Sequence, residues 1–214
     1  MNISIDLTAH AGEYMKKLFF LFVLIFAARP GIGQASFNDS LAQSRNHITQ
    51  NAMLSLGAWA SVNIASGFII ASRTEGEAKY VWRMNAYWNF INLGLAGMGY
   101  LNVRKAMRKK YGLADNLAAQ QSIEKLYVLN FGLDLVYITG GFYLRERVNS
   151  RTLADSRYQF KGYGTSIAIQ GGFLLLMDGV MIMLHHKNTL RLNNQIRRIE
   201  LNAGPGGLGM VYRF

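Results

Sequence analysis

Residues 164–186 read GTSIAIQGGFLLLMDGVMIMLHH, and this stretch is long and apolar enough to cross a lipid bilayer as a helix. It nevertheless carries the amide of Gln170 and the carboxyl group of Asp178. A polar group that faces lipid finds no hydrogen-bond partner there and costs several kcal/mol, so both side chains should point toward other helices. The stretch therefore predicts one helix of a membrane-embedded bundle with a polar interior.

Three other stretches have the same character. Residues 46–72 and 84–103 contain no Asp, Glu, Lys or Arg, and residues 126–144 contain only Asp134. Each is about 20 residues long, the length of a helical span, and none alternates apolar and polar residues as a half-buried strand does. The sequence thus predicts an all-α fold, a four-helix transmembrane bundle with spans near 52–72, 84–106, 122–145 and 162–186.

A soluble periplasmic helical bundle is the alternative architecture. The mean hydropathy of +0.09 and the polar residues inside each stretch favour it. Against it, a helix on the surface of a soluble protein should carry one charged face, and the central turns of these four stretches carry none. Both architectures remain open at the level of sequence.

The polar side chains recur at helical spacing, which places each set on one face of its helix. Tyr127 shares a face with Asp134, and Asp178 shares one with His185. Small residues at 57, 61 and 65, and at 164, 168 and 172, should let helix backbones approach closely. The predicted buried polar cluster, a possible ion or proton site, comprises Asn63, Asn85, Asn89, Asn92, Asn130, Asp134, Gln170 and Asp178.

Within this cluster, Asp134 and Asp178 have two interpretations. As structural groups they would be held by amide and hydroxyl donors and would specify how the helices pack. As functional groups they would bind protons or cations, because carboxylates inside a membrane commonly mark a transport pathway or a proton relay. The sequence leaves both interpretations open.

Several classes of enzyme lack their signatures. There is no cysteine, and no phosphate-binding loop, nucleophile elbow or HExxH motif occurs. His47 and His185 are only weak metal candidates because no carboxylate accompanies them, so no metal or cofactor is predicted. We expect a non-enzymatic interaction or scaffold module of the cell envelope, with a small proton- or cation-coupled transporter or channel subunit as the alternative.

The charge is strongly basic, with 23 Lys and Arg against 12 Asp and Glu and a net charge of +11. Its densest run, VRKAMRKKYG at 103–112, directly follows a predicted span and lacks interleaved aromatic residues. Anionic lipid headgroups suit it better than nucleic acid. The predicted partners are therefore the bilayer and, besides it, a second copy or another envelope protein. The residues expected at the headgroups are Arg104, Lys105, Arg108, Lys109 and Lys110.

The two ends of the chain differ from the middle. MKKLFFLFVLIFAARPGIGQA, from Met15, has the basic start, short apolar core and small residues of a secretory signal, so residues 1–33 read as an upstream extension plus signal peptide. The membrane domain is predicted at 34–191, and a Gly-rich, hairpin-like tail at 192–214. The expected location is the bacterial envelope, in the inner membrane, with both mature termini periplasmic if the signal is cleaved. Counting basic residues in the loops disagrees mildly with that orientation.

Three strings, GYGTSIAIQGGFLLLMDGV (162–180), KYVWRMNAYWNFINLGLAGMGYL (79–101) and NIASG (63–67), resemble a family of small uncharacterised membrane proteins of Gram-negative bacteria. That family is a domain of unknown function, and the resemblance covers about residues 51–191. It implies four helices and no known activity.

Overall fold

A computed structural model describes residues 37–150, 154–197, 199–204 and 207–212 of the chain. The chain divides into two compact units, Met1–Gln34 and Ala35–Phe214. The predicted extension and signal peptide, residues 1–33, lie outside the described residues. All of the helices and strands that the structure describes belong to the second unit.

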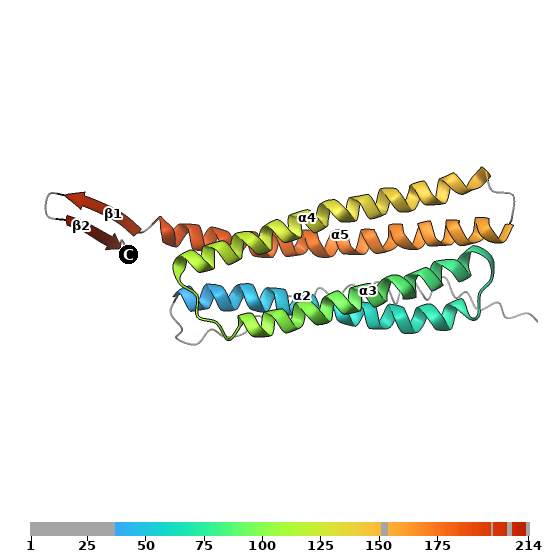
Figure 1. The fold of residues 1–214 in the computed structure, drawn as a ribbon, viewed down its shortest axis with the longest axis horizontal. Coiled ribbons are helices and arrows are strands. Elements are labelled where there is room, and N and C mark those ends of the chain that lie inside the picture. The colour runs from blue at the N-terminus through green and yellow to red at the C-terminus, as the bar shows by residue number, and fades with distance from the viewer. Residues whose placement is uncertain (1–36, 151–153, 198, 205–206, 213–214) are drawn as a thin grey trace, which may run out of the picture. The chain divides into compact units, whose positions relative to one another are not determined.

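Four long helices make up this unit: α2 (Phe37–Ala71), α3 (Gly76–Ala106), α4 (Leu113–Glu146) and α5 (Ala154–Ile196), with a short 3-10 helix, η1 (Arg147–Ser150), after α4 (Figure 1). The predicted all-helical, four-helix architecture is confirmed. Every helix is longer than the predicted span, because charge-poor composition marks only the central turns. The helices continue through polar residues, since the two prolines of the chain lie at 30 and 205 and none interrupts residues 37–197.

Short connections let α2 pack beside α3 and α4 beside α5, whereas α3 and α4 are consecutive but do not form such a pair. Gly76 opens α3 with a φ of +58°, a conformation that a side chain would strain. At the start of α4, the Asp115 carboxylate accepts a hydrogen bond from the Gly112 backbone N–H at 3.3 Å. This contact satisfies one of the amides that a helix start leaves unpaired.

The helices form two hairpins, α2 with α3 and α4 with α5, and α3 packs against α5 to join them (Figure 1). The start of α2 and the end of α5 lie at the same end of the bundle, because Asn188 Nδ2 donates to the Leu41 carbonyl oxygen at 3.3 Å. We call this the α2-start end.

Glycines set the closest backbone approaches. A Cβ added at Gly141 would lie 2.5 Å from the Gly164 carbonyl oxygen, and one at Gly67 would lie 2.8 Å from that of Trp82. The small residues at 164 and 168 therefore meet α4 as expected, whereas a Cβ added at Gly172 would meet nothing within 4 Å. The stripe at 57, 61 and 65 does not work as predicted, because Ser61 and Ala65 are exposed and Gly67 makes the close contact of α2.

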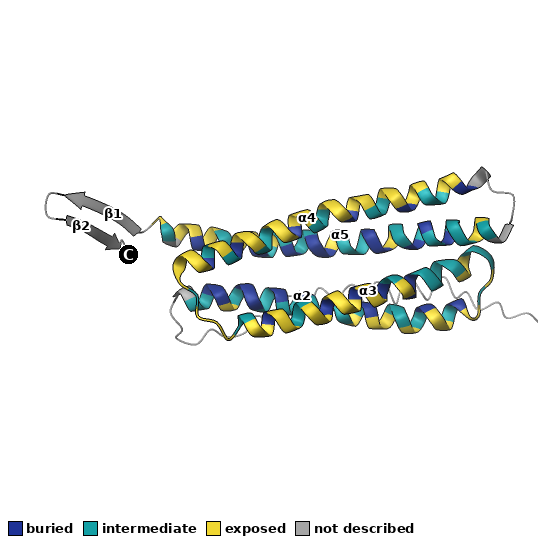
Figure 2. Cartoon of the chain, viewed as in Figure 1, coloured by how far each residue is buried: buried dark blue, intermediate teal, exposed yellow. Residues whose placement is uncertain are grey.

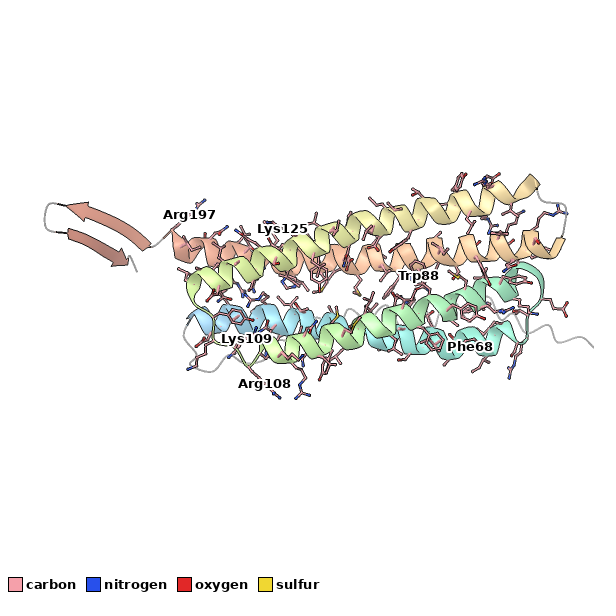
Figure 3. All side chains as sticks on the ribbon, in the orientation of Figure 1. Phe68, Trp88, Arg108, Lys109, Lys125 and Arg197 are labelled. Carbon is pink, nitrogen blue, oxygen red and sulfur yellow. The ribbon has the colours of Figure 1, made fainter. Side chains whose placement is uncertain are left out.

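Many of the buried side chains are polar, and many large apolar side chains are exposed. Among the residues whose burial is described, 15 of those that are buried are polar or charged and 14 are apolar. Large apolar side chains such as Ile91, Met98 and Leu129 are about 60% exposed on the outer faces (Figure 2). Phe68 lies on the same kind of surface, where its ring contacts those of Tyr87 and Phe90 (Figure 3).

Within the described part of the chain, two helical stretches have the length and composition of a membrane span, Asp39–Ala71 and Ser156–Asn194. The sequence predicts four spans. Helices α3 and α4 do not combine the length and the apolar composition of such a span.

After α5, strands β1 (Ile199–Gly204) and β2 (Gly207–Tyr212) pair as an antiparallel hairpin, with Ile199 opposite Tyr212 and Gly204 opposite Gly207. A hairpin thus lies where the tail was expected to form one. Helix α5 continues to Ile196, so the helical region passes the predicted boundary at residue 191.

Candidate functional site

The two carboxyl groups predicted to be of chemical interest lie against each other. Asp134 of α4 and Asp178 of α5 are 3% and 4% exposed, and their side chains are within hydrogen-bonding contact. Two carboxylates at such a separation repel each other, and a hydrogen bond between them requires a proton on one of the two. We call them the carboxyl pair.

The packing of α4 on α5 explains this contact. A Cβ added at Gly171 would lie 3.0 Å from the Asp134 carbonyl oxygen, so the glycine lets the two backbones approach. About two helical turns C-terminal to Asp134, the backbones meet again at Gly141 and Gly164. Side chains that project between the helices on this face are thereby brought together.

Three residues outside the predicted cluster, Tyr127, Thr49 and His185, interact with one another, and one of them interacts electrostatically with Asp178. The Tyr127 hydroxyl forms a hydrogen bond with Thr49 and interacts electrostatically with Asp178. His185 is fully buried, its ring stacks on that of Tyr127 with 5.3 Å between centroids, and its Nε2 lies 3.4 Å from Thr49 Oγ1. The spacing of Tyr127 to Asp134, and of Asp178 to His185, placed two of these on the right faces. Thr49 was missed because it precedes the predicted span of its helix.

The amides form a separate network centred on Asn85. Its Nδ2 donates to Asn63 Oδ1 at 2.9 Å, and its own Oδ1 accepts from Gln170 Nε2. Asn89 Nδ2 donates to the Asn85 carbonyl oxygen at 2.8 Å, and Asn92 Nδ2 to Asn89 Oδ1 at 3.2 Å. These bonds tie α2, α3 and α5 together in what we call the amide network.

The structure therefore divides the single predicted cluster. In the part of the chain that is described, no side-chain hydrogen bond joins the amide network to Asp134 or Asp178. Asn130 is half-buried and belongs to neither group by a hydrogen bond among the same residues. Helical spacing correctly placed these polar side chains, but not which of them touch.

Arg45 is a further buried group that the sequence did not single out. It is 4% exposed, its Nη1 donates to Asn116 Oδ1 at 2.5 Å, and its guanidinium lies 4.7 Å from the centre of the Tyr111 ring. Thr49 Oγ1 donates to its carbonyl oxygen at 3.0 Å. In the sequence Arg45 only precedes a charge-poor stretch, whereas in the structure α2 begins about two turns before it and carries it into the bundle.

The weak metal candidates are not brought together by any described contact. His47 is half-buried, and His185 contacts Thr49 and Tyr127. Among the residues described, no three His, Cys, Asp or Glu side chains are grouped as they would be around a metal ion.

The basic residues expected at lipid headgroups are all exposed or partly exposed, in the last turn of α3 and just after it. Arg108 and Lys109 are labelled there in Figure 3. The residues of this surface are Arg104, Lys105, Arg108, Lys109 and Lys110.

Comparison with known proteins adds a family but no activity. No curated protein and no solved structure matches the chain. Residues 55–179 match the sequence profile of a family of unknown function, DUF6992, within the range over which the resemblance was expected. Since the match covers more than half of the 214 residues, the protein belongs to this family of unknown function.

Proposed function

We propose that this chain is an integral membrane protein of the Gram-negative envelope, in the inner membrane, and that it carries protons on the Asp134–Asp178 pair as a small transporter or channel subunit. Support for the membrane comes from the polarity of the bundle. Large apolar side chains are exposed on its outer faces, and about half of its buried side chains are polar. Water would penalise that arrangement, whereas hydrocarbon favours it.

The observation that carries the proton site is the contact between two buried carboxyl groups. Among the described residues the one ion pair is Arg145 with Glu77, so neither carboxyl group has a basic partner there. A buried carboxyl pair is a costly way to hold two helices together, because an amide would do so without a charge. A site that takes up and releases protons needs this chemistry, and a purely structural contact does not.

The scaffold module that the sequence suggests is the competing function. It would need no carboxyl pair, and the amide network alone would serve it. Neither function requires an enzyme nucleophile or a cofactor. In both, the basic residues at the end of α3 would bind anionic lipid headgroups, which attract clustered Lys and Arg near a membrane surface.

The membrane assignment predicts how the protein fractionates. In alkaline carbonate extraction of bacterial envelopes, the full chain should stay in the membrane pellet, as an integral protein with an apolar surface does. An inner-membrane marker protein should behave in the same way, and a periplasmic protein should be released. Recovery of the chain with the released proteins would reject the assignment and favour the soluble periplasmic bundle.

The proton site predicts the effect of Asp178→Asn. Asparagine keeps the shape and hydrogen bonding of the side chain but removes the proton that the pair shares. In proteoliposomes with an imposed proton gradient, wild type should show proton flux above that of empty liposomes, and the variant should fall to their level. Glu75→Gln, at a position outside the buried polar groups, is the matched control and should leave the flux unchanged.

Two results would count against this site. If wild type carries no proton flux under any imposed gradient, the proposed function is wrong. If Asp178→Asn conducts as wild type does, the pair is structural, and the scaffold function is favoured.

A further inference from the structure

We propose that one acyl chain of an anionic phospholipid lies in a groove between α4 and α5, and that the phosphate of this lipid binds Arg145. The inference rests on the membrane placement in the proposed function and does not depend on the proton site. It assigns a ligand to a part of the outer surface that the proposed function leaves without a role.

The groove is a hollow of about 300 Å³ on the outer surface where α4 packs on α5. A volume at the lower limit of small-molecule sites fits one acyl chain and not a whole lipid. A Cβ added at Gly172 would meet nothing within 4 Å, so this glycine leaves part of the space open. The apolar residues that line the groove are Ile138, Phe142, Ala168, Ile169 and Gly172.

The groove has one polar end and one apolar end. Arg145 and Thr165 line the polar end, where Arg145 Nη1 donates to Thr165 Oγ1. Ile138 lies about 10 Å from Arg145 along α4, at the apolar end. There a Cβ added at Gly171 of α5 would lie 3.0 Å from Ile138 Cγ1. A ligand that matches this groove has a polar head and an apolar tail.

The charge at the polar end favours an anionic head. Among the described residues that line the groove, Arg145 is the charged one, and its side chain is 42% exposed. Glu77 Oε1 accepts from Arg145 Nη1 at 2.5 Å, and in the described part of the chain both side-chain hydrogen bonds of Arg145 use this nitrogen. A guanidinium has five N–H donors, so Nε and Nη2 are left for a phosphate.

The same donors argue against a second copy of the chain as the occupant. An apolar helix packed into the groove would cover Nε and Nη2 of Arg145 without offering an acceptor, which costs free energy. A phospholipid offers both an acceptor and an apolar chain.

The direction of the groove also fits a lipid in a bilayer. Arg145 lies in the last turn of α4, at the end of the bundle opposite the α2-start end. From there the groove runs along α4 to Ile138, one turn from the buried Asp134. Its polar end is therefore the outer one, as the phosphate of a phospholipid is, and the acyl chain would point inward.

The test maps where a lipid chain lies on the full protein. The probe is phosphatidylglycerol with a photoreactive group midway along one acyl chain, added in trace amounts to phosphatidylcholine nanodiscs that hold the purified chain. After illumination, mass spectrometry of peptides identifies the labelled residues. Labelling should concentrate at residues 138–142 and 168–172, above the level at exposed residues outside the groove such as Leu129.

Two leucine substitutions test the shape of the groove. Gly172→Leu fills it and should lower the labelling of its residues to the level at Leu129. Gly132→Leu adds the same side chain to an exposed position on α4, where a Cβ would also meet nothing within 4 Å, and should leave the labelling unchanged. Circular dichroism reports whether each variant is folded.

Two further variants test the contact with the phosphate. Arg145→Gln removes the positive charge and should lower the labelling of the groove about fivefold, the effect of one basic residue on the binding of an anionic lipid. Glu77→Gln breaks the same ion pair but keeps the charge of Arg145, so it should be labelled at least as strongly as wild type. Photoreactive phosphatidylcholine should label the wild-type groove about as weakly as phosphatidylglycerol labels Arg145→Gln.

Three results would overturn the proposal. Labelling spread evenly over the exposed apolar residues of α4 and α5 would show that no site exists in the groove. Equal losses in folded Arg145→Gln and Glu77→Gln would show that the ion pair only shapes the groove. An unlabelled groove, with a wild-type dimer that Gly172→Leu makes monomeric in mild detergent, would identify a second copy as the occupant. None of these results bears on the membrane placement, which fails if alkaline carbonate releases the chain.

Discussion

Replacing Gly164 with leucine should separate α4 from α5 and destabilise the bundle by about 3 kcal/mol or more, at the upper end of the cost of overpacking. A Cβ at this position would lie 2.8 Å from the Arg145 backbone nitrogen and closer still to the Gly141 carbonyl oxygen. Backbone atoms cannot turn aside as a flexible side chain can, so the helices must move apart. Unfolding by denaturing detergent, followed by circular dichroism, measures the loss.

Gly172→Leu is the matched control on the same helix. A Cβ at Gly172 would meet nothing within 4 Å, so the leucine has open space and should change stability little. Equal destabilisation by the two substitutions would contradict the close approach of α4 and α5 at Gly164. Because the same packing brings Asp134 to Asp178, Gly164→Leu should also lower the proton flux in proteoliposomes.

Asn85→Leu should have the second large effect on stability, about 2–4 kcal/mol, because the buried amide of Gln170 and the half-buried amide of Asn63 each lose a partner. Asn63 Oδ1 loses the donor that lies 2.9 Å away, and Gln170 Nε2 loses its acceptor. The Gln170 amide cannot turn to water, because it is buried where three helices meet, whereas Asn63 is half-buried and can do so in part. The same detergent unfolding measures this loss.

Two comparisons test the reason for that effect. Asn102 is exposed on the same helix, so Asn102→Leu should leave stability nearly unchanged. The double variant with Asn85→Leu and Gln170→Leu also lacks the Gln170 amide that lost its partner. It should recover part of the lost stability, because two apolar side chains leave no hydrogen bond unmade between them. If the double variant is less stable by the sum of the two single effects, Asn85 and Gln170 do not act as a hydrogen-bonded pair.

The two groups of buried polar residues should thus respond in opposite ways. Changes in the amide network should lower stability, because its bonds cross between α2, α3 and α5. Asp178→Asn should keep the fold, because asparagine can still bond to Asp134, and should stop proton flux. A scaffold protein would show the first response without the second.

Much of the architecture follows from local sequence. The charge-poor stretches, such as those around Asn89 and Asp178, predicted the four helices. Helix formation, and the set of residues that share one face of a helix, both depend on residues that are close in the sequence. The same spacing correctly predicted that Asn85, Asn89, Asp134 and Gln170 turn inward and are buried. The helix ends were misjudged, since apolar composition reports the surroundings of a helix and not where its hydrogen bonds stop.

Contacts between helices were decided only by the tertiary structure. A stripe of polar residues defines a face, but the register and rotation of each helix against its neighbours determine which side chains touch. Because of that register, Asp134 contacts Asp178, and the amide network forms a separate group of hydrogen bonds. Asn130 is half-buried. It also buried Thr49 beside His185, in a part of α2 that its polar sequence did not mark as a span. These contacts join residues that are far apart in the chain. They depend on where glycines let two helix backbones approach each other, and no local sequence pattern encodes that.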